Sequence, residues 1–330
     1  MGLAVTVLLL AWALHDVSLA QIAMHVRQAH VGWLLVAVVT ATLTFPLRTI
    51  RWQLILRGDD GRRLPFGDLW HAVAIGFMAN NLLPARAGEF ARAYVASRRL
   101  PVRFTTALAS IGVERVFDGL IMVAGMAIAI AAPTFPAHAT VLGTPLSRVA
   151  TGAAALFSGL LVFSLLVVHY PTPWLRLLDR TLHAVLPARL AERALTIAEG
   201  IIAGLEVLKQ PGRFAGVVAW SCVLWGVNAA SFAICFRAFD LPIPPAGALL
   251  LQGVIGFGVA VPSSPGFVGV FEAATRLTLS IYAISPELAV GYALTYHATT
   301  LLPITILGFA SLSRTRLHLA ELRSPAAAER

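Results

Sequence analysis

The sequence predicts an all-α polytopic membrane protein, and two observations carry this prediction. Of the 330 residues, 58% are hydrophobic and only 12% are charged, whereas soluble domains carry about 25% charged residues. Long apolar runs also recur along the whole chain, with arginines at their ends, as in cytoplasmic loops. This composition excludes an ordinary soluble domain, a disordered chain and a coiled coil.

The charge balance bears on the partners. The net charge is +9, and Lys209 is the single lysine among the basic residues. A basic excess can indicate nucleic-acid binding, but these arginines flank apolar runs, so we expect no nucleic-acid partner. Arginine makes bidentate contacts with phosphate, which suits a phospholipid and the surrounding membrane lipids. Cys222 and Cys235 suggest neither a disulfide nor a metal site. We expect no cofactor, and a homo-oligomer stays possible.

The apolar runs indicate which segments cross the membrane. They cover residues 2–14, 31–50, 70–83, 104–132, 148–169, 213–236, 247–261, 266–284 and 287–312. A helix that crosses the hydrocarbon needs about 20 residues, and the longest runs supply that length. Runs 70–83 and 247–261 are shorter, and each stops at a proline close to a glycine. Such segments are re-entrant hairpins or broken helices.

The loop charges predict the orientation. Arginines flank the first short run on both sides, with Arg48, Arg51, Arg57, Arg62 and Arg63 before it. The positive-inside rule therefore makes both flanks cytoplasmic and residues 70–91 a hairpin from the cytoplasm. Loop 133–147 lacks Lys and Arg and is expected outside. Segment 247–284 is then a hairpin that enters from outside. The prediction is about six full spans plus two broken hairpins in the inner (cytoplasmic) cell membrane, with a cytoplasmic C-terminus.

Each half of this topology contains the same order of spans around one broken hairpin. Three spans per half is an odd number, so the halves have opposite orientations. Pro84-x3-Gly88 also matches the spacing of Pro265-x3-Gly269. We therefore expect an inverted repeat, a plan of transporters that places the site near the membrane midplane.

One transmembrane domain is predicted over residues 1–312, followed by a cytoplasmic tail over 313–330. Within that domain, residues 170–212 alternate apolar and charged side chains at helical spacing. This pattern predicts two amphipathic helices on the cytoplasmic interface, and a solvated linker helix is the alternative.

A first polar cluster lies at the end of the first short run. It contains Asn81, Arg86, Glu89 and Arg92. Burying these groups unpaired would cost several kcal/mol each, so they must pair, line water or hold a ligand. The two arginines suit a phosphate. A capping and ion-pair network that closes the hairpin is the alternative.

A second cluster lies inside the run 104–132, where Glu114 and Asp118 share a helix face beside Arg115. Ionisable groups within a membrane helix indicate a functional site, although a network that ties this span to the hairpin would also explain them. We expect Arg86, Glu89, Arg115 and Asp118 to form one charged site.

A third cluster surrounds the second break, where Ser263, Ser264 and Glu272 border the start of a half-helix. Free N–H groups at a helix start favour an anion, whereas Glu272 favours a cation or a donor. His297 in the last span is a further candidate, either packed and hydrogen-bonded or a proton carrier. The chain contains no G-x-S-x-G, H-E-x-x-H, P-loop or C-x-x-C motif. We therefore expect no enzymatic activity.

At these clusters the chain resembles the transmembrane, flippase-like domain of lysylphosphatidylglycerol synthases and its stand-alone YbhN-like relatives. The matching pieces are Arg48-x-x-Arg51-Trp52, Asn81-x-x-Pro84-x-Arg86-x-Gly88-Glu89-x-x-Arg92, Glu114-Arg115-x-x-Asp118 and Pro262-x-x-Pro265-Gly266-x-x-Gly269-x-x-Glu272. The resemblance implies a lipid-handling domain that moves a phospholipid, or an aminoacylated one, between leaflets.

The chain departs from that family in two ways. The synthases carry a soluble aminoacyl-transferase domain, and this chain ends at Arg330 without room for one. At His297, relatives usually have arginine. We therefore expect a flippase for a phospholipid or lipid-linked anion that lacks its own synthase domain. The alternatives are an intramembrane transferase, an accessory subunit of a lipid-modifying enzyme, and a small-solute transporter.

Overall fold

The computed structural model describes residues 2–84, 86–136, 140–141, 144–204, 209–260, 264–315 and 317. As predicted, this part of the chain is helical almost throughout. Its helices are α1 (Gly2–Leu14), α2 (Leu19–Gln28), α3 (Val31–Ile55), α4 (Phe66–Leu82), α5 (Ala87–Arg99), α6 (Phe104–Ala131), α7 (Leu146–His169), α8 (Pro171–Val185), α9 (Ala188–Gly204), α10 (Pro211–Ala238), α11 (Pro245–Gly258), the 3-10 turn η2 (Pro265–Phe267), α12 (Val270–Ser280) and α13 (Pro286–Thr315). The strands β1 (Thr140–Val141) and β2 (Thr144–Pro145) form a short antiparallel ladder.

Many large apolar side chains are exposed on the outside of this helical assembly, and several charged side chains are buried within it. Leu8 of α1 is 70% exposed and Ile306 of α13 is 64% exposed, whereas Arg51 and Glu114 are fully buried. Water would favour the opposite distribution, and a hydrocarbon solvent favours this one. The fold is therefore that of a membrane protein.

Three described helices are long and apolar enough to cross a membrane, namely α3, α10 and α13. The pair α1 and α2 would add a fourth crossing as one broken span, bent by 82°. Helix α6 is continuous over 28 residues but contains Glu114, Arg115 and Asp118. The count of six full spans stays a prediction. Helix α2 was not expected, because its sequence mixes polar and apolar residues without a long apolar run.

The helices break at both positions where the sequence predicts a break. Helix α4 ends at Leu82 and α5 begins at Ala87, with Arg86 in the left-handed backbone region at φ 56°. The second break separates α11 from α12 and contains η2. Gly88 of α5 lies so close to α4 that a Cβ on it would overlap the carbonyl oxygen of Gly76. Only a residue without a Cβ fits this contact, which explains the glycine at position 88.

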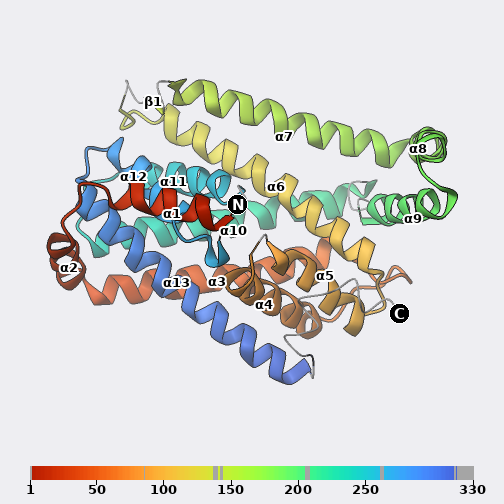
Figure 1. The fold of residues 1–330 in the computed structure, drawn as a ribbon, viewed down its shortest axis with the longest axis horizontal. Helices are drawn as coiled ribbons and strands as arrows, with labels where there is room; N and C mark the ends of the chain where they lie inside the picture. Colours follow the sequence, from red (N-terminus) through yellow and green to blue (C-terminus); the bar gives the residue numbers. More distant parts are fainter. Residues whose placement is uncertain are drawn as a thin grey trace.

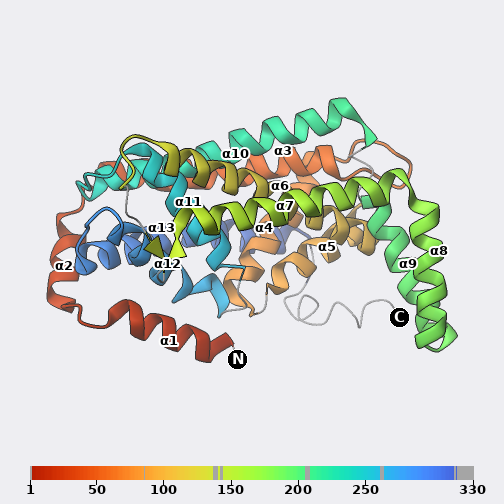
Figure 2. The same ribbon diagram turned by 90° about the horizontal axis from the view of Figure 1, so that it is seen from above.

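Helices from the first half of the chain pack against helices from the second half. Helices α3 and α10 pack along each other, α4 packs against α13, and α11 packs against α6. Within the halves, α4 pairs with α5 and α11 pairs with α12. Figure 1 shows α3 and α10 along the long axis, with α6 and α13 running obliquely to them. Figure 2 shows α1 on the face opposite α3 and α10.

The predicted amphipathic region forms two separate helices at one end of the molecule (Figure 1). Helix α8 buries none of its residues, and α9 packs against α6. Their location on a cytoplasmic interface stays a prediction. Helix α13 continues to Thr315, and most of the predicted tail, residues 318–330, lies outside the described residues.

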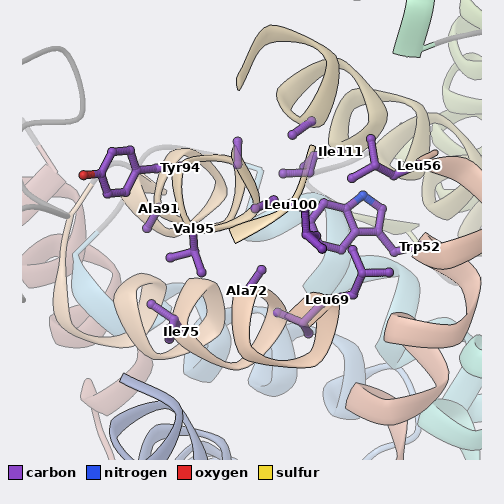
Figure 3. Close-up of a cluster of buried hydrophobic side chains, with 14 of the residues drawn as sticks. Trp52, Leu56, Leu69, Ala72, Ile75, Ala91, Tyr94, Val95, Leu100 and Ile111 are labelled. Atoms are coloured by element: carbon purple, nitrogen blue, oxygen red, sulfur yellow. The ribbon is translucent and has the colours of Figure 1, made fainter. Parts of the chain in front are cut away.

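A cluster of buried apolar side chains fixes the first hairpin to its neighbours (Figure 3). Trp52 of α3 is fully buried and belongs to the same cluster as Leu69 of α4, Leu100 directly after α5, and Ile111 of α6. The Trp52 indole N–H donates to the Ser110 hydroxyl at 2.8 Å. This apolar packing fixes α4 and α5 against α3 and α6.

The Gly76–Gly88 contact yields the first testable prediction. Gly88→Ala should lower the midpoint of thermal unfolding in detergent, because the added methyl separates α4 from α5. Gly112→Ala on α6 is the matched control, since a Cβ there meets nothing within 4 Å. That control should unfold at the same or a higher temperature, because alanine is the better helix former. Equal midpoints for the two variants would contradict the close-packing explanation.

Candidate functional site

A cavity with a volume of about 400 Å³ lies at the centre of the fold. Its wall combines both helix breaks with α3, α6, α10 and α13. Most of the polar residues singled out in the sequence reach this wall. They are Asn81, Arg86, Glu89, Arg92, Arg115, Asp118 and His297. Residues from the first two sequence clusters and His297 of the last span therefore share one space.

Arg51 of α3 connects the two acids of α6 beside this cavity. Its guanidinium is fully buried, with Nη1 2.5 Å from Asp118 Oδ1 and Nη2 3.3 Å from Glu114 Oε1. The Ser221 hydroxyl accepts a further hydrogen bond from Arg51 at 3.1 Å. Trp225 of α10 donates to Asp118 at 2.8 Å. Helices α3, α6 and α10 are thus joined by one buried network.

Two further buried arginines extend this network to the cavity wall. Arg92 of α5 pairs with Glu114 and stacks on the Trp52 ring at 3.7 Å. Arg48 of α3 lies 3.4 Å from Asp118 and faces aromatic rings on α4 and α10. The network holds the first hairpin against α3 and α6.

Arg86 and Arg115 lie at the more open side of the same network. Arg115 reaches Asp118 at 3.4 Å and Glu89 at 3.8 Å. Arg86 lies 3.6 Å from Glu89, and its Nε and Nη2 donate to the Val259 carbonyl at 3.1 and 2.6 Å. Because Val259 follows α11, this contact links the first helix break to the second.

The network holds more positive than negative charge. Five arginines face three carboxylates, which leaves a net charge of +2: Arg48, Arg51, Arg86, Arg92 and Arg115 against Glu89, Glu114 and Asp118. Several guanidinium N–H groups have no hydrogen-bond partner among the described residues. They are Arg48 Nε, Arg51 Nε, Arg92 Nε, Arg92 Nη2 and Arg115 Nε. Buried unpaired donors and excess positive charge favour an anion.

Glu272 of α12 and His297 of α13 form a second polar pair, of which His297 lines the cavity. Glu272 Oε2 accepts the Gly269 N–H at 2.6 Å, and Oε1 lies 2.7 Å from His297 Nδ1. The His297 ring stacks on Phe271 with a centroid distance of 4.3 Å. Gln252 of α11, which is nearly fully buried, also lines the cavity.

The remaining candidates lie elsewhere or serve local contacts. The Asn81 amide donates to the Thr305 hydroxyl at 2.8 Å and so ties the first break to α13. Ser264 donates its backbone N–H to Thr6 of α1, and its hydroxyl bonds to the backbone of its own loop. Ser263 lies outside the described residues.

The structure brings together Arg86, Glu89, Arg115 and Asp118, with Arg92 beside them. It also corrects the interpretation of Arg48 and Arg51 as charges of a cytoplasmic flank. Both lie inside α3 and are buried. Their i,i+3 spacing beside Trp52, continuous with an apolar run, was the signal that could have identified them.

Comparison of the sequence with known proteins shows the family to which the chain belongs. The family described as the lysylphosphatidylglycerol synthase TM region matches residues 1–308. A relative named glycosyltransferase AglD, from Haloferax volcanii, is 30% identical over 324 residues. The match covers 90% of this chain and 51% of the relative, so the chain spans about half the length of that protein. No solved structure matches the chain.

The glycosyltransferase relative corrects one expectation. The absence of catalytic motifs in the sequence predicted a protein without enzymatic activity. The comparison contradicts that prediction, because the similar protein is named a glycosyltransferase. The motifs sought are signatures of particular hydrolases, metalloproteases, nucleotide-binding proteins and redox enzymes, so their absence does not exclude a transferase.

Arg51 carries the second testable prediction. Arg51→Met should lower the free energy of unfolding by about 3–5 kcal/mol, because it leaves Glu114 and Asp118 buried without their shared partner. Thermal unfolding of the detergent-purified protein measures the effect. The exposed Arg237, at the end of α10, provides the matched control Arg237→Met. If both variants unfold at the same temperature, Arg51 does not hold the network together.

Proposed function

Because the chain belongs to the lysylphosphatidylglycerol synthase TM region family, we propose that it binds a phospholipid or lipid-linked anion by its phosphate in the central cavity and moves that headgroup between leaflets. One observation carries the proposal above the others. The buried network around the cavity has a net charge of +2 and contains unpaired guanidinium donors. A lipid phosphate would bring negative charge and acceptor oxygens to this positively charged network.

Membrane burial makes this argument stronger than it would be on a protein surface. A charge at the centre of a membrane helix costs at least about 2.5–3.5 kcal/mol on insertion scales. The chain carries this cost with more arginines than carboxylates, although a balanced set would serve a purely structural network. The acyl chains of a bound lipid would stay among the exposed apolar side chains of the outer faces.

The two helix breaks would act as the moving parts of this transport. They meet at the cavity through the Arg86–Val259 contact. The exchanged packing of α4 on α13 and α11 on α6 supports an inverted repeat, in which opposed hairpins open the site to opposite sides in turn. The described residues offer no nucleotide-binding loop, so the transport would be facilitated or driven by an ion gradient.

Transfer of a group to or from the bound lipid is a second candidate function. The relative named glycosyltransferase AglD favours it. The same phosphate site would hold a lipid-linked phosphate while a sugar is transferred, either by this chain or by an enzyme that it serves as an accessory subunit. Formation of a glycolipid product from an added donor, compared with lipid movement alone, separates the two candidates.

Arg115→Lys tests the phosphate-binding role. Lysine keeps the positive charge near Asp118 and Glu89 but cannot make a bidentate phosphate contact. We expect the variant to unfold near the wild-type temperature and to lose at least about tenfold in the rate of lipid movement. A fluorescent phospholipid in proteoliposomes, quenched from outside by dithionite, measures the rate.

Arg237→Lys, outside the cavity, is the control for this experiment. It should move lipid at the wild-type rate. Lipid movement by Arg115→Lys at that same rate would contradict the phosphate-binding role and leave Arg115 with a structural function.

Cysteine labelling tests the opposed hairpins. Ser97→Cys lies in the last turn of α5 in the first half, and Ser285→Cys lies between α12 and α13 in the second half. In a chain with Cys222 and Cys235 replaced by alanine, the first should react with a membrane-impermeant maleimide only from the cytoplasmic side. The second should react only from outside. Labelling of both positions from one side would contradict the inverted repeat.

A further inference from the structure

Helix α1 lies against the second hairpin and apart from the longest helices of the fold. Its main packing partner is α12. It occupies the face opposite α3 and α10 (Figure 2), and a bend of 82° separates it from α2. Its outward side chains are apolar, with Val7 58% and Leu8 70% exposed. The position of α1 is therefore set mainly by its contacts with the second hairpin.

Thr6 of α1 contacts both flanks of the 3-10 turn η2. Its hydroxyl accepts a hydrogen bond from the Ser264 N–H, directly before η2, at 3.2 Å. On the other flank, a Cβ on Gly269 would lie 2.7 Å from the Thr6 carbonyl oxygen, so the two backbones touch. The side of the second break that carries these two residues is thus covered by α1.

The same short turn forms part of the cavity wall. Gly266 and Phe267 of η2 line the cavity, and the Arg86 guanidinium lies over the Phe267 ring at 6.0 Å. Ser264 and Gly269, which contact α1, are not among the lining residues, and no described residue of α1 reaches the cavity. The turn η2 therefore lies between the cavity and α1.

The backbone of this turn has an unfavourable conformation. Gly266, Phe267 and Gly269 have φ values of 66°, 59° and 86°. The left-handed region is costly for a residue with a side chain, such as Phe267, so this conformation persists only while neighbouring contacts fix it. Arg86 supplies such a contact from the cavity, and α1 supplies contacts from outside. Residues held in this way are concentrated in segments that switch between conformations.

Arg276 of α12 holds the other end of α1. Its Nη1 donates to the carbonyl oxygens of Trp12, Ala13 and His15 at 2.7, 2.8 and 3.1 Å, and its guanidinium lies over the Trp12 ring at 5.2 Å. The last carbonyls of a helix lack full intrahelical pairing, and leaving them unpaired within a membrane is costly. Arg276 and Thr6 thus hold α1 on the second hairpin at two separate points.

The geometry points to α1 as a lateral gate of the central cavity. In this structure α1 closes the second break from the surrounding membrane, and the cavity opens sideways when the contacts of Thr6 and Arg276 with the second hairpin separate. This inference rests on the proposed function, because the opening is the route by which a lipid headgroup would enter while its acyl chains stay in the bilayer. Thr6 and Arg276 control the opening without contacting the ligand.

A reversible crosslink tests whether the gate must open. In a chain with Cys222 and Cys235 replaced by alanine, Thr6→Cys and Ser264→Cys are joined by a short bis-methanethiosulfonate, which reduction removes. Because these two positions are in contact, the crosslink holds α1 on the break. Movement of a fluorescent phospholipid in proteoliposomes should slow by at least about tenfold, because the open state is removed, and should recover after reduction.

The matched control is a crosslink elsewhere in the fold. Phe163→Cys on α7 and Trp174→Cys on α8 replace two rings that contact each other, with centroids 5.4 Å apart. Joining these positions with the same reagent should leave the rate of lipid movement unchanged.

Two substitutions that loosen the gate should have the opposite effect. Thr6→Val removes the hydroxyl acceptor, and Arg276→Met removes the hydrogen bonds to the end of α1. In the same cysteine-free chain, Thr300→Cys places a thiol in the cavity wall, where its reaction rate with N-ethylmaleimide reports opening. This rate should rise about threefold with Thr6→Val and at least about tenfold with Arg276→Met, because the closed state loses one neutral hydrogen bond or several charged ones.

Two matched controls keep the gate intact. Thr40→Val removes a hydroxyl that bonds within α3, and Arg237→Met removes an exposed charge at the end of α10. Both should label at the wild-type rate. If Thr6→Val and Arg276→Met lower the midpoint of thermal unfolding but leave the labelling rate below that midpoint unchanged, α1 has a structural role and the gate is wrong.

The outcomes separate this inference from the proposed function. If the crosslinked protein moves lipid as fast as the reduced protein, the gate is wrong and lipid transport stands. If labelling of Thr300→Cys rises in the loosened variants but the wild-type protein moves no phospholipid, the gate stands and the proposed function fails.

Discussion

The ion pairs of Arg51 with Glu114 and Asp118 are the constraint on which the rest of this structure depends. Two carboxylates one helical turn apart on α6 cannot remain ionised within a membrane without buried cations, and Arg51 supplies a contact to each. Arg92 of α5 then pairs with the second oxygen of Glu114, and Arg48 of α3 pairs with the second oxygen of Asp118. Because these partners come from different helices, charge compensation and helix packing are one requirement. The surplus of arginine left after this pairing borders the cavity.

The hairpin geometry follows from the same requirement. The Gly76–Gly88 contact allows α5 to approach α4 closely enough for Arg92 to reach Glu114. The break before α5 leaves Arg86 in a left-handed conformation, from which its side chain reaches the carbonyl of Val259 after α11. An anion that draws Arg86 toward the cavity would compete with this contact. On the proposed mechanism, binding in the cavity would be linked to movement of the second hairpin through the Arg86 side chain.

Much of the fold could be predicted from the sequence, and the errors have physical causes. Proline and glycine at the ends of short apolar runs located both helix breaks, and helical periodicity located α8 and α9, because these are local signals. The burial of Arg48 and Arg51 was missed, since an arginine at the end of an apolar run looks the same in a cytoplasmic loop and in a buried ion pair. Only the positions of Glu114 and Asp118, more than sixty residues later, distinguish the two. The His297–Glu272 contact and the position of Gln252 in the cavity wall likewise depend on tertiary packing. The family could be recognised because its motifs combine several such positions.

Photo-crosslinking with a phospholipid that carries a diazirine in its headgroup tests most directly whether a lipid phosphate occupies the central cavity. The proposal predicts adducts on cavity residues such as Phe267, Thr300 and Ile304. It also predicts that Arg115→Glu removes them, because the reversed charge cancels the positive excess of the network. Adducts confined to the exposed outer faces, at positions such as Leu166 and Ile306, and unchanged by Arg115→Glu, would contradict the account.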